Sequence, residues 1–133
     1  MICNREGQDD IAASLGLKPT TVSPATWSGH VYSCSYRYPN GAVSLSVKEL
    51  ATKSATTAYF TSFAQVLGRR SNQLTLGQGA FSTTNGSVVV RKDTKVLFVD
   101  ISRLTGQLGL PPKNAAAAAV YVAAAVLGCW TGS

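Results

Sequence analysis

The chain has 133 residues, a length that fits a single domain over residues 1–133 with a hydrophobic core of its own. Only 14% of the residues are charged, and 12 Lys and Arg against 6 Asp and Glu leave a net charge of +6. The basic residues are scattered and form no run of five or more, so they give no strong signal for a nucleic-acid partner. We interpret them as the charges that keep an otherwise charge-poor surface hydrated.

Hydrophobic periodicity divides the chain into helices and strands. In chain order it predicts a helix at 8–15, strands at 31–38 and 42–49, a helix at 54–67, strands at 73–76, 80–83, 87–92 and 95–102, and a helix at 115–127. Residues 19–29 and 103–113 are predicted loops. The order αββα, three or four strands and a last helix predicts an α+β fold. In it, an antiparallel sheet of about five to six strands has its helices packed on one face.

Local signals mark the ends of several elements. The sequence Asn40-Gly41 predicts a hairpin between the first two strands. Gly68 is a plausible stop for the second helix, and Asn114 is a candidate N-cap for the last one. The apolar stretch at 115–130 falls short of the ~20 residues that cross a bilayer, so we expect a buried helix and no transmembrane span.

The first strand and the loop before it supply candidate ligand-binding residues. Strict alternation over 31–38 places Tyr38 on one face of the strand and Arg37 on the other. Tyr38 stands at the rim and is the tyrosine we expect to be exposed. Trp27 is the one large apolar residue of its loop and is expected to anchor that loop to the core. Together with Arg37, Trp27 and Tyr38 could line a binding groove.

Asp100 is the most informative carboxylate, because it falls within the otherwise apolar strand 95–102. If buried, it would need a basic partner or a polar pocket, and a solvent-facing strand end is the simpler interpretation. His30 is the one histidine, so any Ser-His-Asp or Cys-His arrangement would pass through it. We predict no catalytic residue, because no two acids are spaced for acid/base work. The Gly77-Gln78-Gly79 turn lacks the helix of a phosphate-binding loop, and no cofactor is expected.

The three cysteines lack the spacing of a zinc or redox site, so we predict no metal. A disulfide between Cys3 and Cys34 would tie the start of the chain to its first strand and implies an oxidising compartment. Cys129 would then be buried near the end of the last helix or available for pairing between chains. The alternative is that all three are small core residues of a cytosolic protein.

Several motifs share the pattern of one kind of domain. They are Cys3 before the first helix, YSCSY at 32–36, LGQGAF at 76–81, GSVVVRKD at 86–93, VLFV at 96–99 and the Ala-rich last helix. In these the chain resembles small secreted or lipid-anchored actinobacterial domains of unknown function. The resemblance implies export, one disulfide and no established activity, and it transfers no catalytic residue. Such domains carry two cysteines, so Cys129 departs from the pattern.

Two classes of function follow. The favoured one is a non-enzymatic, sensor-like extracytoplasmic module, the mature part of a longer precursor, that recognises a protein, a cell-envelope component or a small ligand. The alternative is a small enzyme or enzyme inhibitor with a polar site around Asp100 and His30. A groove lined by Trp27 and Tyr38 would favour the first class, and a polar cleft around Asp100 would favour the second. The sequence leaves the oligomeric state open.

Overall fold

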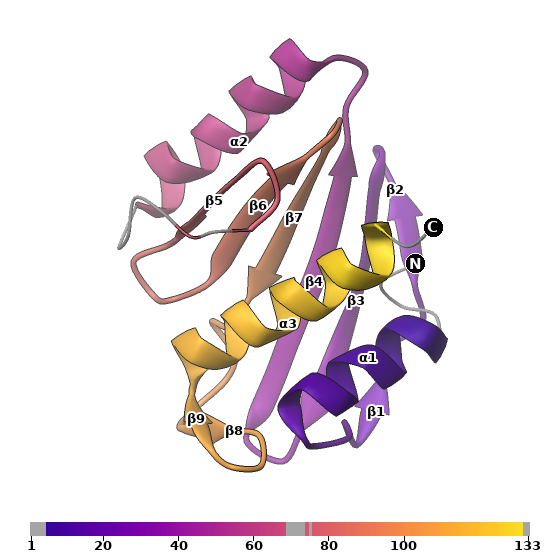
Figure 1. Cartoon of the computed structure of the whole chain (residues 1–133), viewed down its shortest axis with the longest axis vertical. Coiled ribbons are helices and arrows are strands. Elements are labelled where there is room, and N and C mark those ends of the chain that lie inside the picture. The colour runs from indigo at the N-terminus through magenta and orange to yellow at the C-terminus, as the bar shows by residue number, and fades with distance from the viewer. Residues whose placement is uncertain (1–4, 69–73, 75, 132–133) are drawn as a thin grey trace.

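The computed structural model describes residues 5–68, 74 and 76–131, with only the backbone described for residues 129–131. In this part of the chain, helices lie against a large sheet (Figure 1). The helices are α1 (Arg5–Leu15), α2 (Lys53–Leu67) and α3 (Ala115–Thr131). The strands are β1 (Thr21–Val22), β2 (Thr26–Ser28), β3 (Val31–Tyr38), β4 (Gly41–Glu49), β5 (Gly79–Ser82), β6 (Val88–Lys92), β7 (Lys95–Asp100), β8 (Gln107–Leu108) and β9 (Lys113–Asn114).

The large sheet is antiparallel throughout, which confirms the predicted α+β class. Its strands follow the order β1-β3-β4-β7-β6-β5, and β2 also pairs with β3. β3 and β4 are neighbours in this order and form the hairpin that the Asn40-Gly41 signal predicts. β8 and β9 form a separate two-stranded sheet within the predicted loop at 103–113 and the residue after it.

Helices cover both faces of the sheet, so the prediction that they share one face is wrong. α1 and α3 lie side by side on one face, where Ile11, Leu15 and several alanines of α3 pack against β3, β4, β6 and β7. α2 packs on the opposite face through Phe60, against Phe81 and Val89. Consecutive residues of a strand point to opposite faces, and all three valines that begin β6 are fully buried. Both faces of β6 are therefore covered.

Two helix ends confirm the capping signals of the sequence, and a third cap was not predicted. Gly68 ends α2 as expected, while Thr52, which caps the start of α2 by accepting a hydrogen bond from the backbone N–H of Ala55 at 3.0 Å, carried no predicted role. Asn114 accepts from the backbone N–H of Ala117 at 2.8 Å, which confirms the predicted N-cap of α3. α3 continues past its predicted end to Thr131. No helix in the described parts of the chain is both long and apolar enough to cross a bilayer.

Two expectations for the first loop are wrong. Residues 19–29 contain β1 and β2, which pair with opposite ends of β3. Trp27 does not anchor this segment to the core, because its side chain is 54% exposed and makes an edge contact with the ring of His30.

The predicted strand at 73–76 includes residues outside the described part of the chain.

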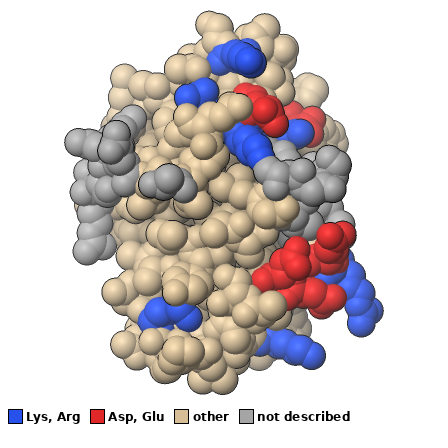
Figure 2. All heavy atoms as spheres, viewed as in Figure 1, with Lys and Arg blue, Asp and Glu red and all other residues tan. Residues whose placement is uncertain are grey.

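Figure 2 shows the face that carries α1 and α3. Much of this face is uncharged, acidic side chains gather over α1, and the basic side chains at the top of the view have acidic side chains among them. On this face the basic residues form no continuous patch, as the scattered distribution along the sequence predicts.

Candidate functional site

The part of the sheet that α2 leaves open carries a row of small hydroxyl side chains. Ser33 and Ser35 alternate along β3 with buried residues, and Ser44 and Ser46 do the same along β4. The registers Ser35↔Ser44 and Ser33↔Ser46 place these serines directly opposite one another. Serine is small, so these positions leave a hollow in the sheet surface instead of a packed layer.

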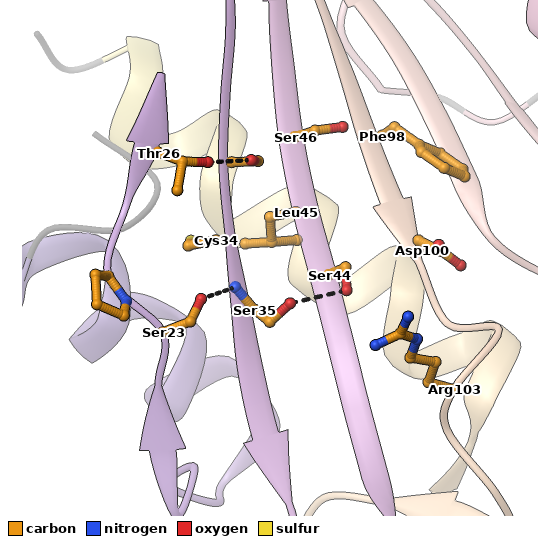
Figure 3. Close-up of a pocket in the computed structure, with 12 residues that line it drawn as sticks. Ser23, Thr26, Cys34, Ser35, Ser44, Leu45, Ser46, Phe98, Asp100 and Arg103 are labelled. Atoms are coloured by element: carbon orange, nitrogen blue, oxygen red, sulfur yellow. Dashed lines mark hydrogen bonds between the residues drawn. The ribbon is translucent and has the colours of Figure 1, made fainter. Parts of the chain in front are cut away.

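We call this hollow the hydroxyl groove; its volume is about 370 Å³. Figure 3 looks onto it with α3 behind the sheet. Its floor and walls come from β2, β3, β4, β7 and the loops beside them. The lining residues are Ser23, Pro24, Thr26, Ser33, Cys34, Ser35, Ser44, Leu45, Ser46, Phe98, Asp100 and Arg103.

The hydroxyl groups form short hydrogen-bonded pairs across the strands. The oxygens of Ser35 and Ser44 are 3.0 Å apart, and those of Thr26 and Ser33 are 2.9 Å apart. The Ser23 hydroxyl accepts from the backbone N–H of Ser35 at 2.7 Å. Each hydroxyl has one hydrogen and two lone pairs, so a pair that uses one hydrogen retains a free donor and free acceptors. The groove can therefore both donate to and accept from a ligand.

Asp100 and Arg103 give one end of the groove its charges. Asp100 lies opposite Ser44 in the β4–β7 register, which continues the row from Ser35. Its carboxylate accepts from the backbone N–H of Ser102 at 2.8 Å and is half-buried. The guanidinium group of Arg103 is exposed and donates no hydrogen bond to any residue that the structure describes. Figure 3 shows both side chains at the same end, beside Ser44.

The hairpin turn between β3 and β4 holds the loop that carries Arg103. The side-chain amide of Asn40 donates to the carbonyl oxygens of Thr105 and Gln107, at 2.5 and 2.7 Å. The backbone N–H of Thr105 donates in return to the carbonyl oxygen of Asn40 at 3.0 Å. These bonds fix the backbone on both sides of the turn, so Arg103 is presented from a restrained loop.

The residues predicted from sequence to line a groove are not brought together. Tyr38 is only 3% exposed and belongs to the core on the α1 and α3 face, so the prediction that it is the exposed tyrosine is wrong. Arg37 is exposed on the opposite face of β3, and Trp27 pairs with Tyr32 at the other end of that strand. Of the predicted ligand-binding residues, Asp100 alone lines the hydroxyl groove.

Tyr38 is the last residue of β3, yet this end of the strand is not an exposed rim. The loop after β7 extends over this end, and Leu104 joins the same buried cluster. The Tyr38 hydroxyl is buried and has no hydrogen-bond partner among the described residues. Burial raises the pKa of Tyr38 to about 12, because the phenolate would lose its hydration.

Asp100 and His30 do not form a joint site. Asp100 lies in the same cross-strand row as Ser35, while His30 precedes the first residue of β3. Five residues of extended chain separate these two positions, about 17 Å at ~3.4 Å per residue. The backbone carbonyl of His30 accepts from the N–H of Glu49 at 2.9 Å, and its side chain contacts Trp27.

The cysteine predictions fall partly outside the described residues. Cys34 is 6% exposed and lies on the core face of β3. Cys3 and the side chain of Cys129 are outside the description, so the pairing of Cys3 with Cys34 stays a prediction. Among the described residues, no group of three or more His, Cys, Asp or Glu side chains could hold a metal ion.

Sequence reasoning missed the hydroxyl residues of the groove. Their signal was present, because the strand pattern alternates serine with large apolar or aromatic residues in both β3 and β4. A face of serines that is paired across a hairpin indicates a sheet surface that no helix covers.

Comparisons with protein-family models, curated proteins and solved structures find no match.

Proposed function

We propose that this domain is a non-enzymatic, extracytoplasmic binding module that holds a polyhydroxylated ligand, of the saccharide class, in the hydroxyl groove. The observation that carries this proposal is the paired hydroxyl array of Ser35, Ser44, Thr26 and Ser33, open to a groove of about 370 Å³. Sugar hydroxyls both donate and accept, and the serine pairs offer them both kinds of partner. The volume lies in the range of small-molecule sites.

The charges of the groove favour a neutral ligand over an anion. Arg103 is the one cationic side chain of its lining, and the Asp100 carboxylate lies at the same end. A carboxylate beside the single cation repels a phosphate or sulfate group. A carboxylate and a guanidinium group together can instead accept from and donate to adjacent hydroxyls of one sugar.

The enzymatic alternative has less support. The groove contains the polar cleft around Asp100 that would favour an enzyme, yet His30 does not line this groove. The described lining supplies one carboxylate and no imidazole to activate a nucleophile. Binding therefore accounts for the groove better than catalysis does, because binding needs neither a second carboxylate nor an imidazole.

The extracytoplasmic location belongs to this proposal. It rests on the resemblance to secreted or lipid-anchored actinobacterial domains and on the predicted disulfide between Cys3 and Cys34. The burial of Cys34 is compatible with such a bond, since a buried thiol or disulfide sulfur needs no water. A saccharide ligand outside the cell would be a component of the envelope.

The test is to titrate a panel of neutral, amino and uronic-acid oligosaccharides, beginning with maltose, into ¹⁵N-labelled protein. Shifted amide resonances should map to β3, β4 and β7 around the groove. The double variant Ser44→Ala/Ser46→Ala should bind about tenfold or more weakly, because each lost hydrogen bond contributes ~0.5–1.5 kcal/mol. The matched control, Ser28→Ala/Ser54→Ala, removes two exposed hydroxyls outside the groove and should bind like the wild type. Absence of shifts with every member of the panel would overturn the proposal.

A further inference from the structure

A second, apolar groove adjoins the hydroxyl groove. It has a volume of about 330 Å³ and is lined by Tyr59, Ser62, Phe63, Val66 and Leu67 of α2 together with Phe98 of β7. Val66 is 81% exposed. α2 carries no charged residue after Lys53, so no charged side chain of this helix hydrates the apolar surface around Val66. Exposed apolar side chains that line a hollow mark a binding surface.

Phe98 is the wall that the two grooves share. Its ring lies 5.1 Å from the ring of Phe63, on the apolar side. In the β4–β7 register it lies opposite Ser46, on the hydroxyl side. The same cross-strand row therefore passes from Thr26 and Ser33, through Ser46, to Phe98. A ligand bound along this row would contact hydroxyl groups at one end and the aromatic ring of Phe98 at the other.

We propose that the ligand is an amphiphile, with a saccharide head in the hydroxyl groove and an alkyl chain in the apolar groove beside α2. The inference rests on the proposed function, since it assigns the head to the same site. A saccharide alone would leave the exposed surface of Val66 and Phe63 in water, and an apolar molecule alone would leave the serine hydroxyls without a ligand. A molecule with both parts covers both grooves across Phe98.

The alkyl chain gives the inference a graded test. The intact chain is titrated with maltose and with hexyl, octyl and decyl maltoside, each below its critical micelle concentration. Burial of apolar chain surface should raise the affinity about three- to tenfold for each two added CH₂ groups. A decyl sulfobetaine, which has the chain without the sugar, should bind at least tenfold more weakly than decyl maltoside.

A pair of neighbouring variants locates the chain. Val66→Asp places a charge in the apolar groove and should abolish the dependence of affinity on chain length while leaving maltose binding unchanged. Gln65→Asp introduces the same charge at an exposed position of α2 outside the groove and should keep the wild-type dependence. Both positions are exposed, so neither variant is expected to unfold the domain.

The outcomes separate this inference from the proposed function. If saccharides bind but the chain length has no effect, the amphiphile is wrong and the saccharide site stands. If decyl sulfobetaine binds as tightly as decyl maltoside, the apolar groove takes chains without a sugar head and the inference is overturned. If Val66→Asp and Gln65→Asp behave alike, the chain does not lie in this groove. Failure of the whole saccharide panel overturns the proposed function itself.

Discussion

The backbone of Gly41 lies directly against the carbonyl group of Arg103. A Cβ atom at position 41 would overlap the Arg103 carbonyl oxygen and lie 2.9 Å from the Cα of Leu104. The φ angle of Gly41 is also +133°, a backbone conformation that residues with a side chain rarely adopt. The glycine at the start of β4 thus allows the backbone of the Arg103 loop to lie against the β3–β4 hairpin.

The substitution Gly41→Ala should destabilise the domain by about 2–4 kcal/mol, because both the φ angle and the contact with rigid backbone oppose a methyl group. The measurement is the free energy of unfolding from urea denaturation. Gly29→Ala is the control: its φ is +57°, but no atom lies within 4 Å of the added Cβ. It should lose only about 1–2 kcal/mol, the cost of the left-handed conformation alone. Equal losses in the two variants would refute the role given to the Arg103 contact.

Tyr38 should give the protein a stability that is lost at alkaline pH. Its pKa is raised by burial from 10.0 to about 12, so the unfolded chain releases this proton at lower pH than the folded one. The contribution is fully present below pH 10 and is lost as pH rises toward 12. Two pKa units correspond to about 3 kcal/mol across this window.

The variant Tyr38→Phe should lack that part of the alkaline loss when unfolding free energies are compared from pH 8 to pH 11. At neutral pH it should equal the wild type or exceed it by about 1 kcal/mol, since it removes a buried hydroxyl that has no partner among the described residues. Tyr121→Phe, which removes a phenol that is 48% exposed, is the control for the loss of a tyrosine as such. A Tyr38→Phe variant with the full wild-type slope would contradict the assigned burial.

The sequence predicts the central strands well and the placement of the helices poorly. β3 occupies the predicted range 31–38, because strict alternation and the Asn40-Gly41 turn mark both its extent and its register. β1 and β2 have two and three residues, too few to show a period. The periodicity of a helix shows which of its sides is buried but does not say on which face of a sheet it packs.

The strands themselves carried the missing information about the two faces. Val88, Val89 and Val90 are consecutive apolar residues, which indicates a strand covered on both faces, whereas β3 and β4 alternate with serine. These two patterns predict that both faces of β6 are covered and that one face of β3 and β4 is exposed to solvent. Asp100 was found because a carboxylate in an apolar strand is conspicuous. The serines were missed because each one alone is an ordinary surface residue.

The alanines of α3 should be sensitive to size only where they face the sheet and α1. Ala123 is fully buried, while its neighbour Ala124 is exposed. Ala123→Leu should cost about 1–3 kcal/mol or more, because the larger side chain has no space in a packed interior. Ala124→Leu should change the stability by less than about 0.5 kcal/mol. Thermal unfolding followed by circular dichroism measures both, and a similar loss in the two variants would contradict the packing of α3.

The last prediction concerns the bond between Cys3 and Cys34. Peptide mapping of protein prepared from an oxidising compartment, without reduction, should recover the peptides of these two residues as one linked species. The bond would close a loop of about thirty residues, so the variant Cys3→Ser should lose about 3–4 kcal/mol of stability. Reduction of the wild type should cause a comparable loss.

Cys129→Ser is the matched control for that bond. Since Cys129 takes no part in the predicted bond between Cys3 and Cys34, this variant should keep the linked peptides and the stability of the wild type. Recovery of Cys34 linked to Cys129 instead would show that the bond ties β3 to the end of α3. The predicted pairing would then be wrong, while the implied oxidising compartment would stand. Three free thiols in the unreduced protein would remove the argument for export along with the pairing.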